Sequence, residues 1–90
     1  MSASLADLAR ARGHAQDRAA VVRALQPTRE LSFRDLREAT GLDRARLSNA
    51  LVSLEIRALV EARKADDSRN RYKLTRTGRA QVEAVNGAMP

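Results

Sequence analysis

Hydrophobic residues in the first third of the chain recur at helical spacing, and residues that start or stop helices lie between them. Ser4 has Asp7 three residues later, which is the spacing of a capping box at a helix start. Gly13 is expected to end this short helix. Asp17 is the next candidate N-cap, and the helix that follows it must end at Pro27. The pattern predicts two helices before residue 27.

The middle of the chain predicts a short extended segment and two further helices. Residues 31–33 are extended, and Ser32 with Asp35 again has capping-box spacing. Gly41 supplies the positive φ that a helix C-cap needs, and Asp43 caps the next helix. One face of that helix carries apolar residues at i, i+3, i+4 and i+7: Leu47, Ala50, Leu51 and Leu54.

Residues 59–65 and 69–75 alternate partly between apolar and polar positions, as a half-exposed antiparallel hairpin does. A polar tip, residues 66–68, lies between them. The inward positions are expected to face each other across the hairpin: Val60, Ala62, Tyr72 and Leu74. The outward positions include Arg63, Arg71 and Lys73, so the hairpin is expected to present cations to solvent.

A last helix is predicted after the hairpin, capped by Thr75, with an apolar side formed by Val82, Val85 and Met89. The order of elements predicts an α+β, mostly α, winged helix-turn-helix fold: a three-helix core, a two-stranded wing and flanking N- and C-terminal helices. The glycine-bearing turn at residues 40–43 is as short as this motif requires. We expect residues 1–16 to form the N-terminal helix and linker, and residues 17–90 the winged domain with its C-terminal helix.

Composition narrows the classes of function. A 90-residue chain buries only roughly 60 to 65% of its unfolded surface, so oligomerisation is an expected supplement to its small core. The net charge of +6 favours a polyanionic partner such as nucleic acid. The absence of cysteine and the single histidine, His14, exclude disulfides and zinc sites, and no cofactor is expected. Without a long apolar run or a signal-peptide pattern, the sequence predicts a cytoplasmic protein.

The third core helix and the hairpin carry residue types suited to duplex DNA. A recognition helix presents its N-terminal residues to base edges, where Arg pairs with guanine, Asn pairs with adenine and Ser suits either. Arg on a β-ribbon can enter a narrow minor groove. Ordinary solvated charges, or charges that protect a sheet edge, are the alternative interpretation. The predicted DNA-binding residues are Ser32, Arg34, Arg44, Ala45, Arg46, Ser48, Asn49, Arg69, Arg71 and Lys73.

Three stretches of the sequence are similar to a known family of proteins. They are Leu-Ser-Phe-Arg-Asp-Leu-Arg-Glu-Ala-Thr-Gly-Leu at 31–42, Leu-Ser-Asn-Ala-Leu-Val-Ser-Leu-Glu at 47–55 and Leu-Thr-Arg-Thr-Gly-Arg at 74–79. Together they resemble small bacterial or archaeal winged-helix regulators of the MarR and ArsR type, over residues 17–86. In MarR-like proteins the wing tip commonly reads Asp-x-Arg-x-Arg, and here Asp67, Arg69 and Arg71 match it. The resemblance implies that Arg69 or Arg71 contacts DNA while Asp67 steadies the loop.

The chain also departs from that family. Ala58 stands where the family usually has Gly, so either a left-handed helix end costs about 1 kcal/mol there or the helix exits differently. Ile56 stands where a charge is usual, and we expect either burial in the last helical turn or a subunit contact. Because the long flanking helices of MarR proteins are lacking, their ligand pocket is not expected. With no Cys and one His, metal sensing of the ArsR type is excluded.

The sequence therefore predicts a homodimeric, sequence-specific regulator of transcription that binds double-stranded DNA. Its recognition helix would lie in the major groove and its basic wing on the backbone or in the minor groove. Dimerisation is expected to use residues 4–12 and 75–89, and neither a metal nor a membrane is an expected partner. Two alternatives stay open, a winged-helix adaptor between proteins and a plasmid or phage replication or partition factor. An enzyme is not expected, because no phosphate loop, carboxylate pair or activated nucleophile is visible.

Overall fold

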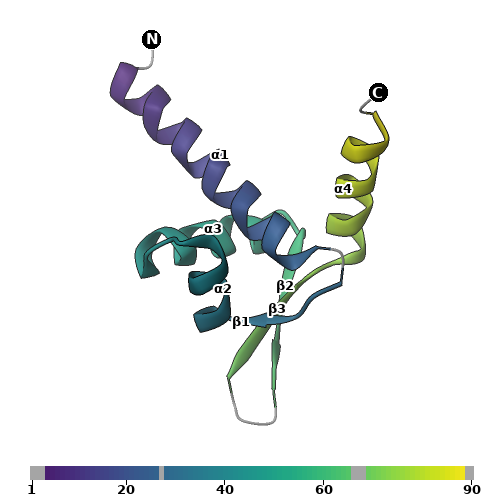
Figure 1. Ribbon diagram of the computed structural model, residues 1–90. Coiled ribbons are helices and arrows are strands. Elements are labelled where there is room, and N and C mark those ends of the chain that lie inside the picture. The colour runs from purple at the N-terminus through teal and green to yellow at the C-terminus, as the bar shows by residue number, and fades with distance from the viewer. Residues whose placement is uncertain (1–3, 27, 66–68, 89–90) are drawn as a thin grey trace.

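The computed structural model describes residues 4–26, 28–65 and 69–88. Its elements in chain order are α1 (Leu5–Leu25), β1 (Leu31–Ser32), α2 (Phe33–Thr40), α3 (Arg44–Ile56), β2 (Val60–Lys64), β3 (Asn70–Leu74) and α4 (Arg76–Ala88). The inner end of α1 packs with α2, α3 and the sheet, while the β2–β3 hairpin projects away from the outer part of α1 and from α4 (Figure 1). The predicted mostly helical α+β winged helix-turn-helix fold is confirmed.

Helix α1 corrects the prediction of two N-terminal helices. It begins after the Ser4 cap, whose Oγ accepts a hydrogen bond from the Asp7 amide at 3.1 Å, and it runs unbroken to Leu25. Gly13 lies in its interior, because about 1 kcal/mol of lost helix propensity does not interrupt a run rich in Ala, Arg and Leu. Asp17 is not an N-cap. It lies in the middle of α1, so the predicted linker is helical and the expected boundary at residue 17 falls within one element.

The predicted start and end of α2 and the predicted start of α3 are confirmed. Ser32 Oγ accepts from the Asp35 amide at 3.1 Å, and Asp43 Oδ1 accepts from the Arg46 amide at 2.8 Å. Gly41 ends α2 with φ 72°, a left-handed conformation that suits a residue without Cβ. These caps fix the short turn that sets α3 against α2.

The wing belongs to a three-stranded antiparallel sheet of order β1-β3-β2, one strand more than predicted. The predicted hairpin register is confirmed, with Val60 opposite Leu74 and Ala62 opposite Tyr72. Val60 is buried as predicted, but Ala62 is exposed, so its predicted inward position is wrong. Leu31 pairs with Tyr72 on the other side of β3. Because β1 leads directly into α2, this pairing joins the wing to the helix-turn-helix.

A compact core lies where α1, α2, α3 and the sheet meet. All four residues of the predicted stripe on α3 are buried. They pack with apolar residues of the other elements: Val21, Leu25, Leu31, Leu36, Leu42, Val60 and Leu74. Val82 of α4 packs against this cluster from outside. Val85 and Met89, the other residues predicted on that side of α4, lie outside the described side chains.

The exit of α3 forms a junction with the start of α4. Ala58 has φ 59°, so the left-handed alternative for this position is the one observed. Its carbonyl accepts a hydrogen bond from Thr75 Oγ1 at 2.6 Å, and the same Oγ1 accepts from the Gly78 amide at 2.9 Å. The predicted cap at Thr75 is confirmed. Gly78 lies so close to Leu59 that an added Cβ would overlap its carbonyl.

Ile56 is 79% exposed at the end of α3, so the predicted burial in the last helical turn is wrong in the single chain. Val52, one turn earlier on the same helix, is 53% exposed. The cause is the orientation of α3, whose inward stripe at Leu47, Leu51 and Leu54 already fills the core. This leaves two large apolar side chains on the outer surface of α3.

Candidate nucleic-acid interface

A groove of about 850 Å³ lies between α2, the first turn of α3 and the wing. The side chains around it come from three elements that the fold brings together through the pairing of β1 with β3. We call it the arginine groove after the basic residues in its lining: Arg34, Arg37, Arg44, Arg69 and Arg71. The groove is also lined by polar and aromatic residues: Ser32, Asn70 and Tyr72.

The arginine groove has an excess of positive charge. Five arginines face two carboxylates, Asp35 and Glu38, within the lining, which leaves a net charge of +3. A long contact of 3.5 Å joins Arg34 Nε to Glu38 Oε1, and both side chains are largely exposed. Exposed ion pairs of this kind contribute little to stability, so Arg34 remains available to a phosphate.

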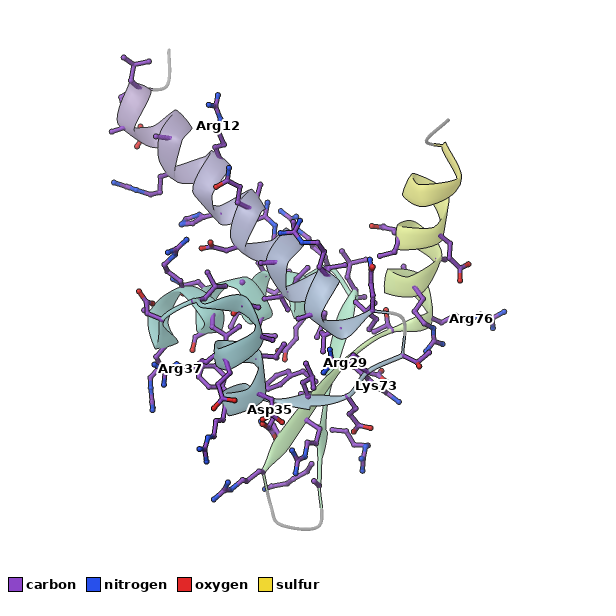
Figure 2. The ribbon with its side chains drawn as sticks, viewed as in Figure 1. Arg12, Arg29, Asp35, Arg37, Lys73 and Arg76 are labelled. Carbon is purple, nitrogen blue, oxygen red and sulfur yellow. The ribbon has the colours of Figure 1, made fainter. Side chains whose placement is uncertain are left out.

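Arg37 is a member of the groove that the sequence did not single out. It lies three residues after Arg34 on α2, and Figure 2 shows it at the surface of this helix with Asp35. The signal was present in the sequence, because residues three apart on a helix lie on neighbouring positions of one face. Arg34 was predicted without Arg37, because the sequence does not show that this face of α2 meets the wing.

The predicted readers on α3 divide between two flanks of the helix. Arg44 lines the arginine groove, whereas Arg46 and Asn49 line a separate cleft of about 120 Å³ between α3 and α1. Ala45 is exposed, and Ser48 is half-buried. The structure thus brings Arg44 together with the wing arginines and places Arg46 away from them.

Arg46 has a specific protein partner. Its Nε and Nη2 donate to the two carboxylate oxygens of Asp17, at 3.2 and 2.6 Å. This hydrogen bonding, with the attraction of the carboxylate charge, raises the pKa of Arg46 above its ordinary value. The predicted role of Arg46 as a reader of bases stays a prediction, and its guanidinium is already held by α1.

Two further ion pairs involve described residues of the wing. Lys73 Nζ lies 3.3 Å from Glu61 Oε1 on the paired strand, and Arg63 Nη2 lies 2.7 Å from Glu30 Oε1 before β1. Arg63 stands opposite Arg71 in the ladder, so two cations are neighbours across the hairpin. Asp67 and the rest of the predicted tip lie outside the described residues.

A second groove, of about 410 Å³, separates α1 from α4 at the base of the sheet. Its lining is mainly apolar and includes Val22, Leu59, Leu74 and Val82. It lies on the part of the molecule from which the outer half of α1 and α4 rise (Figure 1). In the part of the chain that the structure describes, no group of three metal-ligating side chains forms a site, and no helix has the length and apolarity to cross a membrane.

Sequence comparison agrees with this architecture, since a profile described as the winged helix DNA-binding domain matches residues 18–90. The chain belongs to the winged helix DNA-binding domain family. The predicted winged-helix family is confirmed, and the resemblance to a regulator of the MarR family extends to the fold. A sequence search of well-characterised proteins finds no match.

Solved structures share the fold of this winged helix domain. A MarR-family transcriptional regulator from Silicibacter pomeroyi superposes with a TM-score of 0.71 at 21% identity, covering 92% of this chain and 65% of the regulator. The transcriptional regulator PA4135 gives a TM-score of 0.74 at 23% identity over 98% of this chain and 77% of its own. BpsR of Bordetella bronchiseptica, whose DNA binding is regulated by 6-hydroxynicotinic acid, gives 0.67 at 23% identity, with 97% and 74% covered. The chain thus spans about two thirds of the first of these regulators.

Proposed function

We propose that this winged helix protein binds duplex DNA in a sequence-specific manner and regulates transcription. The observation that supports the proposal best is the arginine groove, where cations from α2, α3 and the wing surround one concave surface. A DNA backbone entering this groove would meet several guanidinium groups, each able to bind a phosphate in a bidentate manner. The same placement brings the adjoining face of α3 to the major groove, as in other helix-turn-helix proteins.

The predicted site residues take two roles in this proposal. Readers on α3 contact base edges, with Arg44 suited to guanine, while Ser48 and Ala45 allow close approach. Asn49 is suited to adenine, but it lies beside Arg46 on the flank that faces α1. Anchors hold phosphates: Ser32, Arg34, Arg69, Arg71 and Lys73, together with Arg37, which the structure adds to this set. Ser32 Oγ accepts from the Asp35 amide, so its own hydroxyl hydrogen is still able to donate to a phosphate. Lys73 is the weakest anchor because Glu61 competes for its charge.

We further propose that the protein acts as a homodimer. The first turns of α1 project from the body, and Leu5 there is 84% exposed. The apolar groove between α1 and α4 leaves additional hydrophobic surface on the same side of the molecule. A second copy would cover this surface, and the two-fold symmetry would present two recognition helices to half-sites about 10 base pairs apart, or a multiple of that spacing.

Fluorescence anisotropy tests the proposed function directly. Labelled duplexes, first random and then selected from a library by the protein, are titrated at several salt concentrations. The proposal predicts binding that weakens steeply as salt rises and a selected sequence that binds at least a hundredfold more tightly than random duplex. Failure to bind any duplex at low salt would contradict the proposal.

The exposed Val52 and Ile56 favour one other candidate function, a winged-helix adaptor that binds a protein through α3. In that case these side chains would be covered by a protein partner rather than lie beside DNA. Purification from its host with a stoichiometric protein and without nucleic acid, together with no duplex binding by the isolated chain, would favour the adaptor. Duplex binding with sequence preference would reject it.

A further inference from the structure

Asp17 is unusual among the described residues because it is the one buried side chain that carries a charge. Its side chain is 7% exposed and lies in α1, where it was predicted to start a helix. Both carboxylate oxygens accept hydrogen bonds from Arg46, whose side chain is 55% exposed. A buried carboxylate that loses its cationic partner is strongly destabilising, so this pair must persist when the protein functions.

The pair distinguishes the two arginines in the first turn of α3. Residues two apart on an α-helix are separated by about 200° around its axis, so Arg44 and Arg46 leave α3 on opposite flanks. Arg44 enters the arginine groove, while Arg46 faces α1 and is neutralised by Asp17. The recognition helix therefore presents the cation of Arg44 on one flank, whereas on the other its own cation, Arg46, is neutralised and Arg18 of α1 is the remaining cation among the residues described around that cleft.

From this asymmetry we propose that Asp17 is a specificity-determining residue that acts through Arg46. By holding the Arg46 guanidinium, Asp17 removes a phosphate-binding cation from the α1 flank of α3. The backbone of DNA is then attracted more strongly to the flank that faces α2 and the wing, where it fixes the register of the readers. A protein gains specificity when a complex with DNA in an incorrect position lacks a contact that would stabilise it. The inference rests on the proposed duplex-binding function and replaces the prediction that Arg46 reads bases.

The salt dependence of binding gives a quantitative test. Each phosphate neutralised on duplex DNA contributes about 0.9 to the slope of log affinity against log salt. In Asp17→Asn the Arg46 charge is no longer neutralised and becomes available to a phosphate. We expect the slope for random duplex to steepen by about 0.9, which corresponds to roughly eightfold tighter binding at 0.1 M salt. The preference for the selected sequence over random duplex should fall accordingly.

Two further variants separate this effect from net charge and from folding. Asp7→Asn makes the same change in net charge on the exposed first turn of α1, and it should leave the slope unchanged. Arg46→Gln should lower the melting temperature, because Asp17 loses its partner, yet leave the slope at the wild-type value. The double variant Asp17→Asn with Arg46→Gln should also return the slope to the wild-type value.

The outcomes discriminate clearly. Steepening in Asp17→Asn that is abolished in the double variant supports the inference. An unchanged slope in folded Asp17→Asn overturns it, and so does a slope in Arg46→Gln that flattens as much as in Arg37→Gln, which removes a phosphate anchor. If Asp17→Asn does not fold, the comparison of Arg46→Gln with Arg37→Gln decides. Wild-type protein that binds no duplex would overturn the proposed function itself, whereas wild-type binding with the contrary slopes overturns only the role of Asp17.

Discussion

Arg44 and Arg37 both line the arginine groove, yet they are expected to affect DNA binding differently. Arg44 begins the recognition helix, so Arg44→Ala should lower the preference for the selected sequence by about 1–3 kcal/mol, the value of one bidentate base contact. Arg37→Ala should weaken selected and random duplex equally and flatten the salt slope by about 0.9. Anisotropy titrations on both duplexes measure these effects.

Arg12→Ala is the matched control for these two variants. Arg12 lies on the part of α1 that projects from the body, away from the arginine groove (Figure 2). Its removal changes the net charge by the same amount and should leave both the preference and the slope close to wild type. Equal losses on both duplexes in Arg44→Ala would show that α3 does not read the sequence.

Ala58 offers a test of stability at a single residue. Its φ of 59° costs an L-residue about 1–2 kcal/mol, whereas glycine adopts this conformation freely. Ala58→Gly also loses about 0.5–1 kcal/mol of backbone entropy, so the net free energy of unfolding should rise by about 0.5–1 kcal/mol. Urea denaturation measures the change. Ala58→Val, which is β-branched and unsuited to positive φ, should destabilise the fold, and stabilisation by valine would contradict the argument.

Local signals at single residues were readable from the sequence, and distant partners were not. The caps at Ser32, Gly41 and Asp43 depend on neighbours within three or four residues, so spacing alone predicted them. The pairing of Asp17 with Arg46 joins residues 29 positions apart, and nothing local distinguishes that carboxylate from a helix cap. The same limit applies to the arginine groove, which exists only after β1 pairs with β3.

Two glycines allow a contact between elements to be compared with the interior of a single helix. At Gly78 an added Cβ would overlap the Leu59 carbonyl where α4 starts, so Gly78→Ala should lower the free energy of unfolding by about 1–3 kcal/mol. At Gly13, in the interior of α1, an added Cβ meets no atom within 4 Å. Gly13→Ala should therefore stabilise the protein by up to about 1 kcal/mol. Chemical denaturation of both variants measures the difference. The same sign of change in both would refute the assigned contact at Gly78.

The elements that the sequence predicted correctly are those with strong periodicity. The stripe on α3 and the alternation of β2 and β3 gave both the element type and the hairpin register. The break predicted within α1 was wrong because a glycine and a possible cap were given more weight than the helix formers around them. The strand β1 has only two residues, and its pairing depends on β3 rather than on its own pattern.

At the scale of the whole molecule, the arginine groove and the apolar groove between α1 and α4 are formed by different elements. The arginine groove opens between α2 and the wing, while the outer part of α1 and α4 rise from the other side of the body (Figure 1). The separation lets two copies associate without covering the proposed DNA surface. The net charge of +6 favours DNA binding in every copy and opposes close association, so the dimer contact must be apolar.

This argument leads to a test of the proposed dimer. Leu5 is an exposed apolar residue on the outer part of α1, and Leu5→Glu would bury a carboxylate in the contact between copies. Sedimentation equilibrium should show a dimer for wild type and a monomer for Leu5→Glu at micromolar concentration. Ala39→Glu adds the same charge at an exposed position of α2 and should remain dimeric.

The Leu5→Glu monomer should still bind a single half-site but lose the added affinity of two half-sites on one duplex. A wild-type monomer, or a Leu5→Glu variant that remains dimeric, would contradict the proposed contact.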